Sequence, residues 1–447
     1  MNNHLGEGSS GEETASRAER AEADYERFVW KHLPRNFAGL FTHGMLGMTG
    51  FRLFNAPTFL PTYLYLLSGS NFIVGLGQSL QQFGSMASPV IGATHIEHRK
   101  RVLPATLLIG ALMRAQILGV AVVGFFLHGR PLLLSVLGFL FLLGMFSGAQ
   151  GVAFQLLFAK LIPIVRRGRL QALRNASGGL VAAGLAWAAG RYIIQRNLFG
   201  NGYGTTFLLA FALTSLGLTG MGLLVREPEP PTVRVKSRVL DRVREFPTLL
   251  SQDRAFMFFV IAQALATAGN VAAPFYILFA GGSMPLNGQN LGLLSLAFIG
   301  SSVITNLGWG VAGDRFGFRT TLIGAVATWI GATGLLMAAP ALGRGHVIDT
   351  HTLILIAFFA LGAAQAGFSM SCQTMVLEFG AREDIAMRLG LTNTAQGAVA
   401  AIGPLAGGLI AAVFSYEVLF GVSISFLITA LLIILLLVEE PRFRRLA

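Results

Sequence analysis

The chain has 447 residues, of which 53% are hydrophobic and 12% are charged, and its mean hydropathy is +0.64. Soluble domains carry about 25% charged residues, so the composition excludes an ordinary soluble globular protein. The net charge of +12 would suit a nucleic-acid partner, but the basic residues are placed along the chain in a way that indicates membrane topology instead.

The chain begins with a polar segment, MNNHLGEGSSGEETASRAER, that has too few apolar residues to fold alone. We expect residues 1–36 to form a disordered or amphipathic cytoplasmic tail. The segment shows no signal-peptide pattern.

Twelve apolar runs follow the tail. A run of at least 18 apolar residues with few charges is a candidate membrane helix, and the runs therefore predict an all-α membrane protein with twelve transmembrane helices. The only cysteine, Cys372, falls inside one of them, which excludes an intramolecular disulfide. The runs cover residues 37–66, 71–94, 102–127, 131–158, 171–191, 204–225, 255–280, 288–313, 320–340, 351–377, 388–413 and 416–438.

The basic residues alternate from loop to loop. Most of the 33 Lys and Arg residues fall in the N-terminal tail, the loops after even-numbered runs and the C-terminal tail. Cytoplasmic segments carry the excess of Lys and Arg, so we expect both termini in the cytoplasm. The basic residues in or beside odd-numbered loops are Arg130, Arg191, Arg196 and Arg344.

Two distant segments end in nearly the same way, as LLVREP near residue 228 and LLVEEP near residue 441. The repeat predicts two six-helix halves, 37–228 and 255–441, with a cytoplasmic linker at 229–254 and a short cytoplasmic tail at 442–447. The residues matched at a spacing of 213 are Tyr203/Tyr416, Phe207/Phe420, Val225/Val438, Glu227/Glu440 and Pro228/Pro441.

A loop motif connects this architecture to a known family. The stretch GVAGDRFGFR, residues 310–319, together with two parallel six-helix halves, resembles the major facilitator superfamily over all twelve runs. The resemblance implies a transporter whose halves rock about a site near the middle of the bilayer.

The resemblance also implies a gating latch where the eighth run leaves the membrane. A carboxylate there can meet the positive N-terminal end of the fifth helix, or a cation on it. The open alternative is a set of solvated charges that only enforces topology. In the first half the loop IGATHIEHRKR departs from the pattern, with His95 where an Asp is expected, and only Glu97 is left to pair with Arg388. The latch residues are Asp314, Arg315, Gly317, Arg319, Arg169, Arg174, Glu97 and Arg388.

Two arginines, Arg52 and Arg114, lie well inside predicted helices. A charge at membrane depth costs about 2.5–3.5 kcal/mol, so both are functional candidates. A guanidinium suits a carboxylate or phosphate, and we expect Arg52, in a first helix that Pro57 and Pro61 bend, to contact the substrate. For Arg114, packing or lipid contact remains the alternative.

Neutral polar residues supply the rest of the predicted site. Gln78, Gln81, Gln82 and Ser85 share one face of the second helix. The open alternative for such residues is hydrogen bonding between helices, worth about 0.6 kcal/mol each. The predicted substrate-binding set is Arg52, Asn55, Gln78, Gln82, Gln150, Gln155, Gln263, Asn270, Gln365 and Gln373.

The leading hypothesis is therefore a secondary transporter of a small organic solute, predicted to be an anion, in the bacterial inner membrane. One alternative is an exporter of amphipathic, drug-like compounds, which suits the 35 Phe residues. Another is a non-transporting assembly factor or sensor. We expect no enzyme, catalytic residue, metal, cofactor or nucleic-acid partner, and a chain that works as a monomer in the lipid bilayer.

Overall fold

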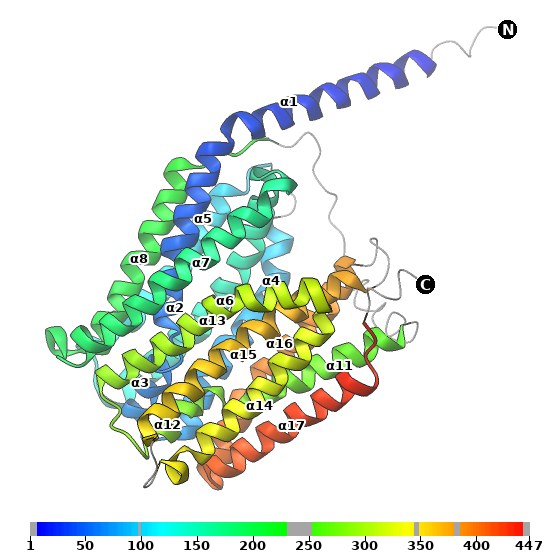
Figure 1. Ribbon diagram of the computed structural model, residues 1–447. Helices are drawn as coiled ribbons and strands as arrows, with labels where there is room; N and C mark the ends of the chain where they lie inside the picture. The colour runs from blue at the N-terminus through cyan, green and yellow to red at the C-terminus, as the bar shows by residue number, and fades with distance from the viewer. Residues whose placement is uncertain (1–6, 97–99, 230–252, 344–347, 380–384, 441–447) are drawn as a thin grey trace.

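The computed structural model describes residues 7–96, 100–229, 253–343, 348–379 and 385–440, and its regular elements in those ranges are all helices (Figure 1). The first half contains α1 (Glu7–Thr42), η1 (His43–Gly47), α2 (Met48–Phe54), α3 (Phe59–Ser68), α4 (Asn71–Ile96), α5 (Leu103–Phe126), α6 (Gly129–Leu161), α7 (Ile164–Ala188), η2 (Ala189–Ile194), η3 (Leu198–Gly200) and α8 (Gly202–Leu224). The second half contains α11 (Arg254–Gly269), η4 (Asn270–Phe275), α12 (Tyr276–Ala280), α13 (Gly288–Phe316), α14 (Phe318–Leu342), α15 (Thr350–Glu378), α16 (Ile385–Val413) and α17 (Tyr416–Leu436).

The N-terminal segment, expected to be a disordered or amphipathic tail, is helical. α1 is helical from Glu7 and runs into the first apolar stretch without interruption, so that it projects beyond the bundle (Figure 1). At its base the Tyr25 hydroxyl donates a hydrogen bond to the carbonyl oxygen of Lys160, 3.2 Å away. Burial, followed by the negative charges of Glu22 and Glu227, raises the pKa of Tyr25 above its usual range.

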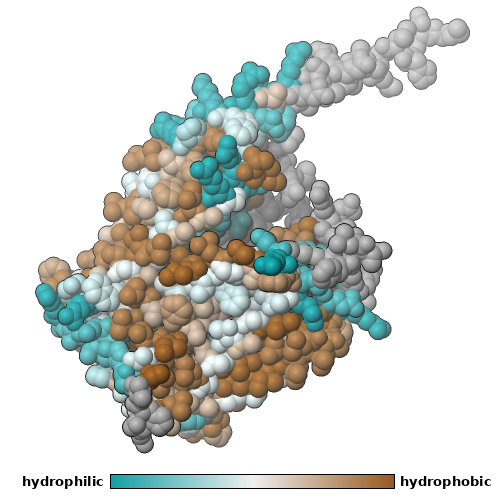
Figure 2. Space-filling view, in the orientation of Figure 1, coloured by the Kyte–Doolittle hydropathy of each residue, from teal (hydrophilic) through white to brown (hydrophobic). Residues whose placement is uncertain are grey.

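Nine helical segments in the described part of the chain are long and apolar enough to cross a membrane: α5, α6, α8, Arg254–Ala280, α13, α14, α15, Met387–Val413 and α17. The other three predicted spans correspond to α1–α3, α4 and α7. Broad apolar areas cover the helices, whereas hydrophilic residues gather on α1 and near the helix ends (Figure 2). The chain is thus a multi-pass helical membrane protein, and the count of twelve spans stays a prediction.

The first helix of each half is broken at a corresponding place. α2 ends at Phe54 and α3 begins at Phe59, with Pro57 between them. In the second half α11 passes into the 3₁₀ segment η4, which contains Pro274. Proline removes a backbone donor and clashes with the preceding turn, and the bend predicted for the first helix is confirmed.

The repeated chain ending has a structural reason. The Glu227 carboxylate accepts hydrogen bonds from the backbone N–H groups of Val102 (2.7 Å) and Leu103 (2.8 Å), where α5 begins. The Glu440 carboxylate accepts one from the N–H of Arg319 (3.1 Å), in the first turn of α14. The first N–H groups of a helix lack helical partners and carry positive partial charge. Each half therefore ties the end of its last helix to the start of its third.

The two halves meet along two seams, where α4 packs against α16 and α7 packs against α13. Glycines allow close approach at both. A Cβ added to Gly75 would lie 2.1 Å from the Pro404 carbonyl oxygen, and one added to Gly190 would lie 2.3 Å from that of Gly288. These contacts lie toward the end of the bundle that carries α3 and α12, called here the α3/α12 end, away from the projecting α1 (Figure 1).

Candidate substrate cavity

A cavity lies between the halves beside the two broken helices. It consists of three hollows of about 410, 300 and 300 Å³. The first and third share Asn55, Pro57 and Ala273, and the second and third share Asn270, Trp329 and Gln365, so the three hollows adjoin one another. Ligand sites typically occupy about 300–1,000 Å³, and the cavity is large enough for a small organic molecule.

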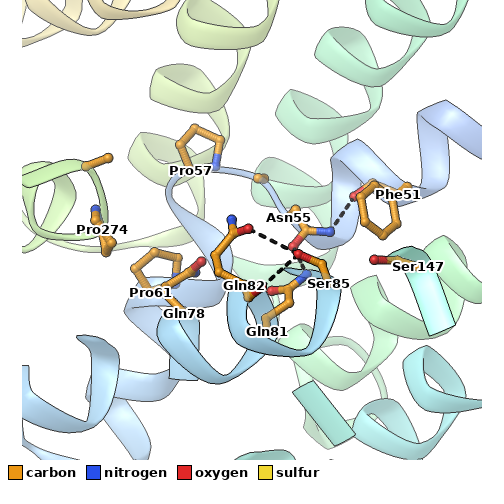
Figure 3. Close-up of a pocket in the computed structure, with 12 residues that line it drawn as sticks. Phe51, Asn55, Pro57, Pro61, Gln78, Gln81, Gln82, Ser85, Ser147 and Pro274 are labelled. Carbon is orange, nitrogen blue, oxygen red and sulfur yellow. Dashed lines mark hydrogen bonds between the residues drawn. The ribbon is translucent and has the colours of Figure 1, made fainter. Parts of the chain in front are cut away.

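The first half contributes a wall of amide and hydroxyl groups, seen in Figure 3. The Gln81 side-chain nitrogen donates to the Asn55 side-chain oxygen (2.9 Å), and the Asn55 nitrogen donates to the Phe51 carbonyl oxygen (3.1 Å). Because α4 is regular here, its polar residues share one face as the spacing predicted. The first-half lining is Phe51, Asn55, Ala56, Pro57, Pro61, Gln78, Gln81, Gln82, Ser85 and Ser147.

The second half contributes a wall in which aromatic rings accompany the amides. Trp329 donates its indole N–H to the Tyr276 hydroxyl (3.3 Å), which is 3.0 Å from the Thr333 hydroxyl, and its ring meets Phe368 edge-on at 5.7 Å between centres. These contacts hold the rings in fixed positions. The lining also includes Asn270, Ala273, Phe298, Phe358, Leu361 and Gln365.

Two further amides come from α16 and were missed in the sequence. Asn393 and Gln396 line the hollow next to Asn270 and Gln365. They lie three residues apart, the spacing of neighbours on one helix face. That signal was available in LTNTAQG, which lies inside the predicted helix at 388–413.

The cavity is closed at the α3/α12 end by hydrogen bonds between the halves. The Thr58 hydroxyl donates to the Leu291 carbonyl oxygen (2.9 Å) and lies 2.6 Å from the Ser295 hydroxyl. Asn71 donates to the Ala411 carbonyl oxygen (3.3 Å) and accepts from the Tyr416 hydroxyl (2.7 Å). Gln82 of α4, a lining residue that lies further from this end, is exposed.

Arg52 is not part of the cavity lining. Its Nη1 donates to the Asn175 carbonyl oxygen of α7 at 3.5 Å. A Cβ added to Gly179 would lie 2.3 Å from this nitrogen and 2.2 Å from Val303 Cγ2. The side chain therefore lies at the α7/α13 seam, while its neighbours Phe51 and Asn55 face the cavity.

Arg114 is packed within the first half. Its Nε donates to the Thr214 carbonyl oxygen and its Nη1 to that of Gly110, both at 2.7 Å, and its Nη2 lies 3.4 Å from His43 Nε2. The side chain is 4% exposed. These contacts match the packing alternative left open for this residue.

The remaining predicted amides divide between buried and exposed positions away from the cavity lining. Gln150 and Gln263 are buried inside their own halves, whereas Gln155 and Gln373 are exposed. Of the predicted set, the cavity brings together Asn55, Gln78, Gln82, Asn270 and Gln365, and leaves out Arg52, Gln150, Gln155, Gln263 and Gln373.

Among the predicted latch residues, Asp314, Arg315 and Arg169 are exposed. Arg319 caps the end of α17, donating to the carbonyl oxygens of Ile434 (3.2 Å) and Leu435 (2.8 Å). Gly317 ends α13 with φ +88°, a conformation that favours glycine.

The two latch arginines that are buried contact an aromatic ring in one case and a carboxylate in the other. The Arg174 guanidinium lies over the Phe154 ring at 4.5 Å. Arg388 donates to the Asp253 carboxylate at 2.9 Å, so the N-cap residue of α11, at the end of the linker, holds it. The pairing predicted with Glu97 lies outside the described residues, and the latch as a whole stays a prediction.

Comparison with known proteins gives a match to a family model over part of the chain and a match in fold to solved structures. Residues 259–446 match the sequence model of the Major Facilitator Superfamily. No curated protein matches the sequence significantly.

Among solved structures, a mutant of the nucleoside transporter NupG matches with TM-score 0.70 at 13% identity, over 90% of this chain and 100% of that one. A bacterial homologue of the iron transporter ferroportin, in an inward-facing state, matches with TM-score 0.69 at 14% identity, over 90% and 98%. A D-xylose-proton symporter matches with TM-score 0.64 at 16% identity, over 91% and 97%. At such identities the likeness is one of fold.

Proposed function

We propose that this chain is a secondary transporter of the major facilitator superfamily that carries a small organic solute through the central cavity by alternating access. The observation that carries the proposal is a cavity that both halves line. It is closed at the α3/α12 end, and its lining residue Gln82 is exposed. When two bundles that share a site rock against each other, access to the site passes from one end to the other.

The placement of basic residues supports the orientation in the membrane. With Lys and Arg gathered in the tails and alternate loops, we propose twelve spans and cytoplasmic termini in a bacterial inner membrane. The proposed domains are a cytoplasmic tail, two six-helix halves and a cytoplasmic linker between them. In this orientation the α3/α12 end faces outward, and the cavity opens toward the cytoplasm. The proposed working unit is a monomer in the bilayer.

The charge of the solute is a separate question. The prediction of an anion rests on Arg52, and the contacts of this side chain at the α7/α13 seam give it less support than the sequence did. The runner-up, export of amphipathic compounds, is favoured by the aromatic rings of the second-half wall.

Locking the closed end tests the proposed mechanism without knowledge of the solute. Because the Thr58 and Ser295 hydroxyls are 2.6 Å apart across the halves, a Thr58→Cys/Ser295→Cys pair in a Cys372→Ser background is placed to form a disulfide. We expect oxidation to abolish alternation. The measurement is labelling of Ala273→Cys, added to the pair as a third cysteine in the cavity lining, by a membrane-impermeant maleimide from each side of oriented vesicles.

Before oxidation, the reagent should reach the cavity cysteine from both sides. After oxidation, labelling from the α3/α12 side should fall at least tenfold and return on reduction. The matched controls carry Ala273→Cys with only Thr58→Cys or only Ser295→Cys, and should be insensitive to oxidation. Labelling from one side only, in every state, would support the non-transporting sensor or assembly factor.

A further inference from the structure

We infer that the solute is an uncharged, ring-containing molecule with several hydroxyl or amide groups, bound with its polar groups toward α4 and its ring toward Trp329. The inference rests on the proposed function and names the substrate class of the same cavity. Its basis is the difference between the two walls, one of amides and hydroxyls and one in which fixed aromatic rings accompany the amides.

Charge is the first criterion. None of the described residues that line the three hollows is Asp, Glu, Lys, Arg or His. During alternation the solute is enclosed and loses its contact with bulk water. Removing an ion from water without a counter-charge costs several kcal/mol, so the lining selects against a net charge of either sign.

Hydrogen bonding is the second criterion. Each primary amide offers an acceptor oxygen and two donor hydrogens, and amides approach the cavity from both halves. Gln81 and Asn55 already bond to each other, but an entirely apolar or weakly polar solute would leave the remaining donors and acceptors unpaired, at about 1–3 kcal/mol for each buried group. Hydroxyl and amide groups match them, because they donate and accept at once. The amides are Asn55, Gln78, Gln81 and Gln82 in the first half and Asn270, Gln365, Asn393 and Gln396 in the second.

The aromatic wall is the third criterion. In the hollow that both halves share, Trp329, Tyr276, Phe298 and Phe358 lie with Asn55 and Pro57. Trp329 is held by its hydrogen bond to Tyr276 and by Phe368, so it offers a fixed surface. A ring packed on such a surface gains contact without reordering the protein, which favours a cyclic solute over a flexible chain.

The test is ligand stabilisation of the purified full-length protein with matched pairs that differ by one phosphate. The uncharged members are adenosine, uridine and a phenyl glucoside, and the charged members are the two nucleoside monophosphates and the 6-phosphate of the same phenyl glucoside. Tetraphenylphosphonium represents an amphipathic cation. We expect at least one uncharged compound to raise the Tm by several degrees at a hundredfold excess over its Kd, and its phosphorylated partner to have no effect.

Variants locate the binding on the two walls. Trp329→Leu and Gln365→Leu should each raise the Kd of the stabilising compound at least tenfold. Gln289→Leu is the matched control, because it removes an exposed amide of α13 that lies outside the lining and outside the predicted site. Its Kd should stay within twofold of the unchanged protein.

Three results would overturn the inference. The first is stabilisation by a phosphorylated compound that is lost in Arg52→Ala, which identifies an anion. The second is stabilisation by tetraphenylphosphonium that depends on Trp329 but not on Gln365. The third is a panel in which no uncharged compound stabilises the protein. In each case the oxidation experiment on Thr58→Cys/Ser295→Cys still decides separately whether the protein alternates.

Discussion

The two halves follow one plan but surround their buried arginines differently. In the second half, Arg388 lies 4.5 Å from the centre of the Phe256 ring and donates to the Asp253 carboxylate. In the first half, Arg174 lies 4.5 Å from the centre of the Phe154 ring and donates to the neutral Gln171 side chain. Each half thus keeps an arginine over a phenylalanine, but Phe154 belongs to α6 and Phe256 to α11, so the two rings are not matching positions of the repeat. The polar partner also differs, an acid in the second half and an amide in the first.

Of the substitutions that test this comparison, removal of Asp253 should lower the stability of the protein most. We expect Asp253→Ala to destabilise the protein by about 3 kcal/mol, because it leaves the buried Arg388 without this acidic partner and removes the N-cap of α11. The measurement is the Tm of the purified protein. Asp253→Asn keeps a capping side chain and removes only the charge. It should therefore recover about a third of the stability that Asp253→Ala loses. Equal Tm values for Asp253→Ala and the unchanged protein would show that the ion pair is not structural.

The two glutamates of the repeated ending should differ in stabilising effect, with Glu227 contributing more than Glu440. Glu227, with a side chain 4% exposed, accepts two backbone N–H groups and lies 3.3 Å from Lys160 Nζ, so Glu227→Ala should cost about 2 kcal/mol. Glu440→Ala should cost about 1 kcal/mol. The control is Glu229→Ala, which removes an exposed ion pair with Arg101 and should change stability by less than about 0.5 kcal/mol. If Glu440→Ala costs more than Glu227→Ala by thermal unfolding, the second half depends more on its chain ending than the first.

The smallest predicted effect concerns the aromatic partner of Arg174. The Phe154 ring has the guanidinium 4.5 Å from its centre and the His43 ring stacked at 5.1 Å. Phe154→Leu should lower stability by about 1 kcal/mol through loss of the cation–π and stacking contacts. Phe126→Leu is the control, since Phe126 is 77% exposed. Equal Tm values for the two variants would show that Arg174 is held by its other contacts.

Much of the fold was predictable because helices in a membrane depend on local properties, namely length, hydropathy and proline. The tail was predicted only as disordered or amphipathic. Residues after Glu7 have too few apolar side chains to fold alone, yet Ala, Glu and Arg are strong helix formers, and extending an existing helix avoids the cost of nucleation. A chain of such residues joined to α1 therefore continues the helix.

The site was predictable where a regular helix presents several polar residues at once, as α4 does with Gln78 and Gln82. It was not predictable at Arg52. Sequence gives the depth of a residue along a helix, but Arg52 lies two residues before the end of α2, beside a break. The direction of its side chain depends on how α2 packs against α7, which involves residues more than a hundred positions away.

The projecting part of α1 has a practical consequence. A 36-residue helix is about 54 Å long, and its inner end is continuous with the first half of the bundle. A small tilt of that half would therefore move the far tip of α1 by a larger distance than the bundle itself. A probe fixed to the outer turns of this helix would test for the proposed rocking motion in real time, at a position far from the proposed solute.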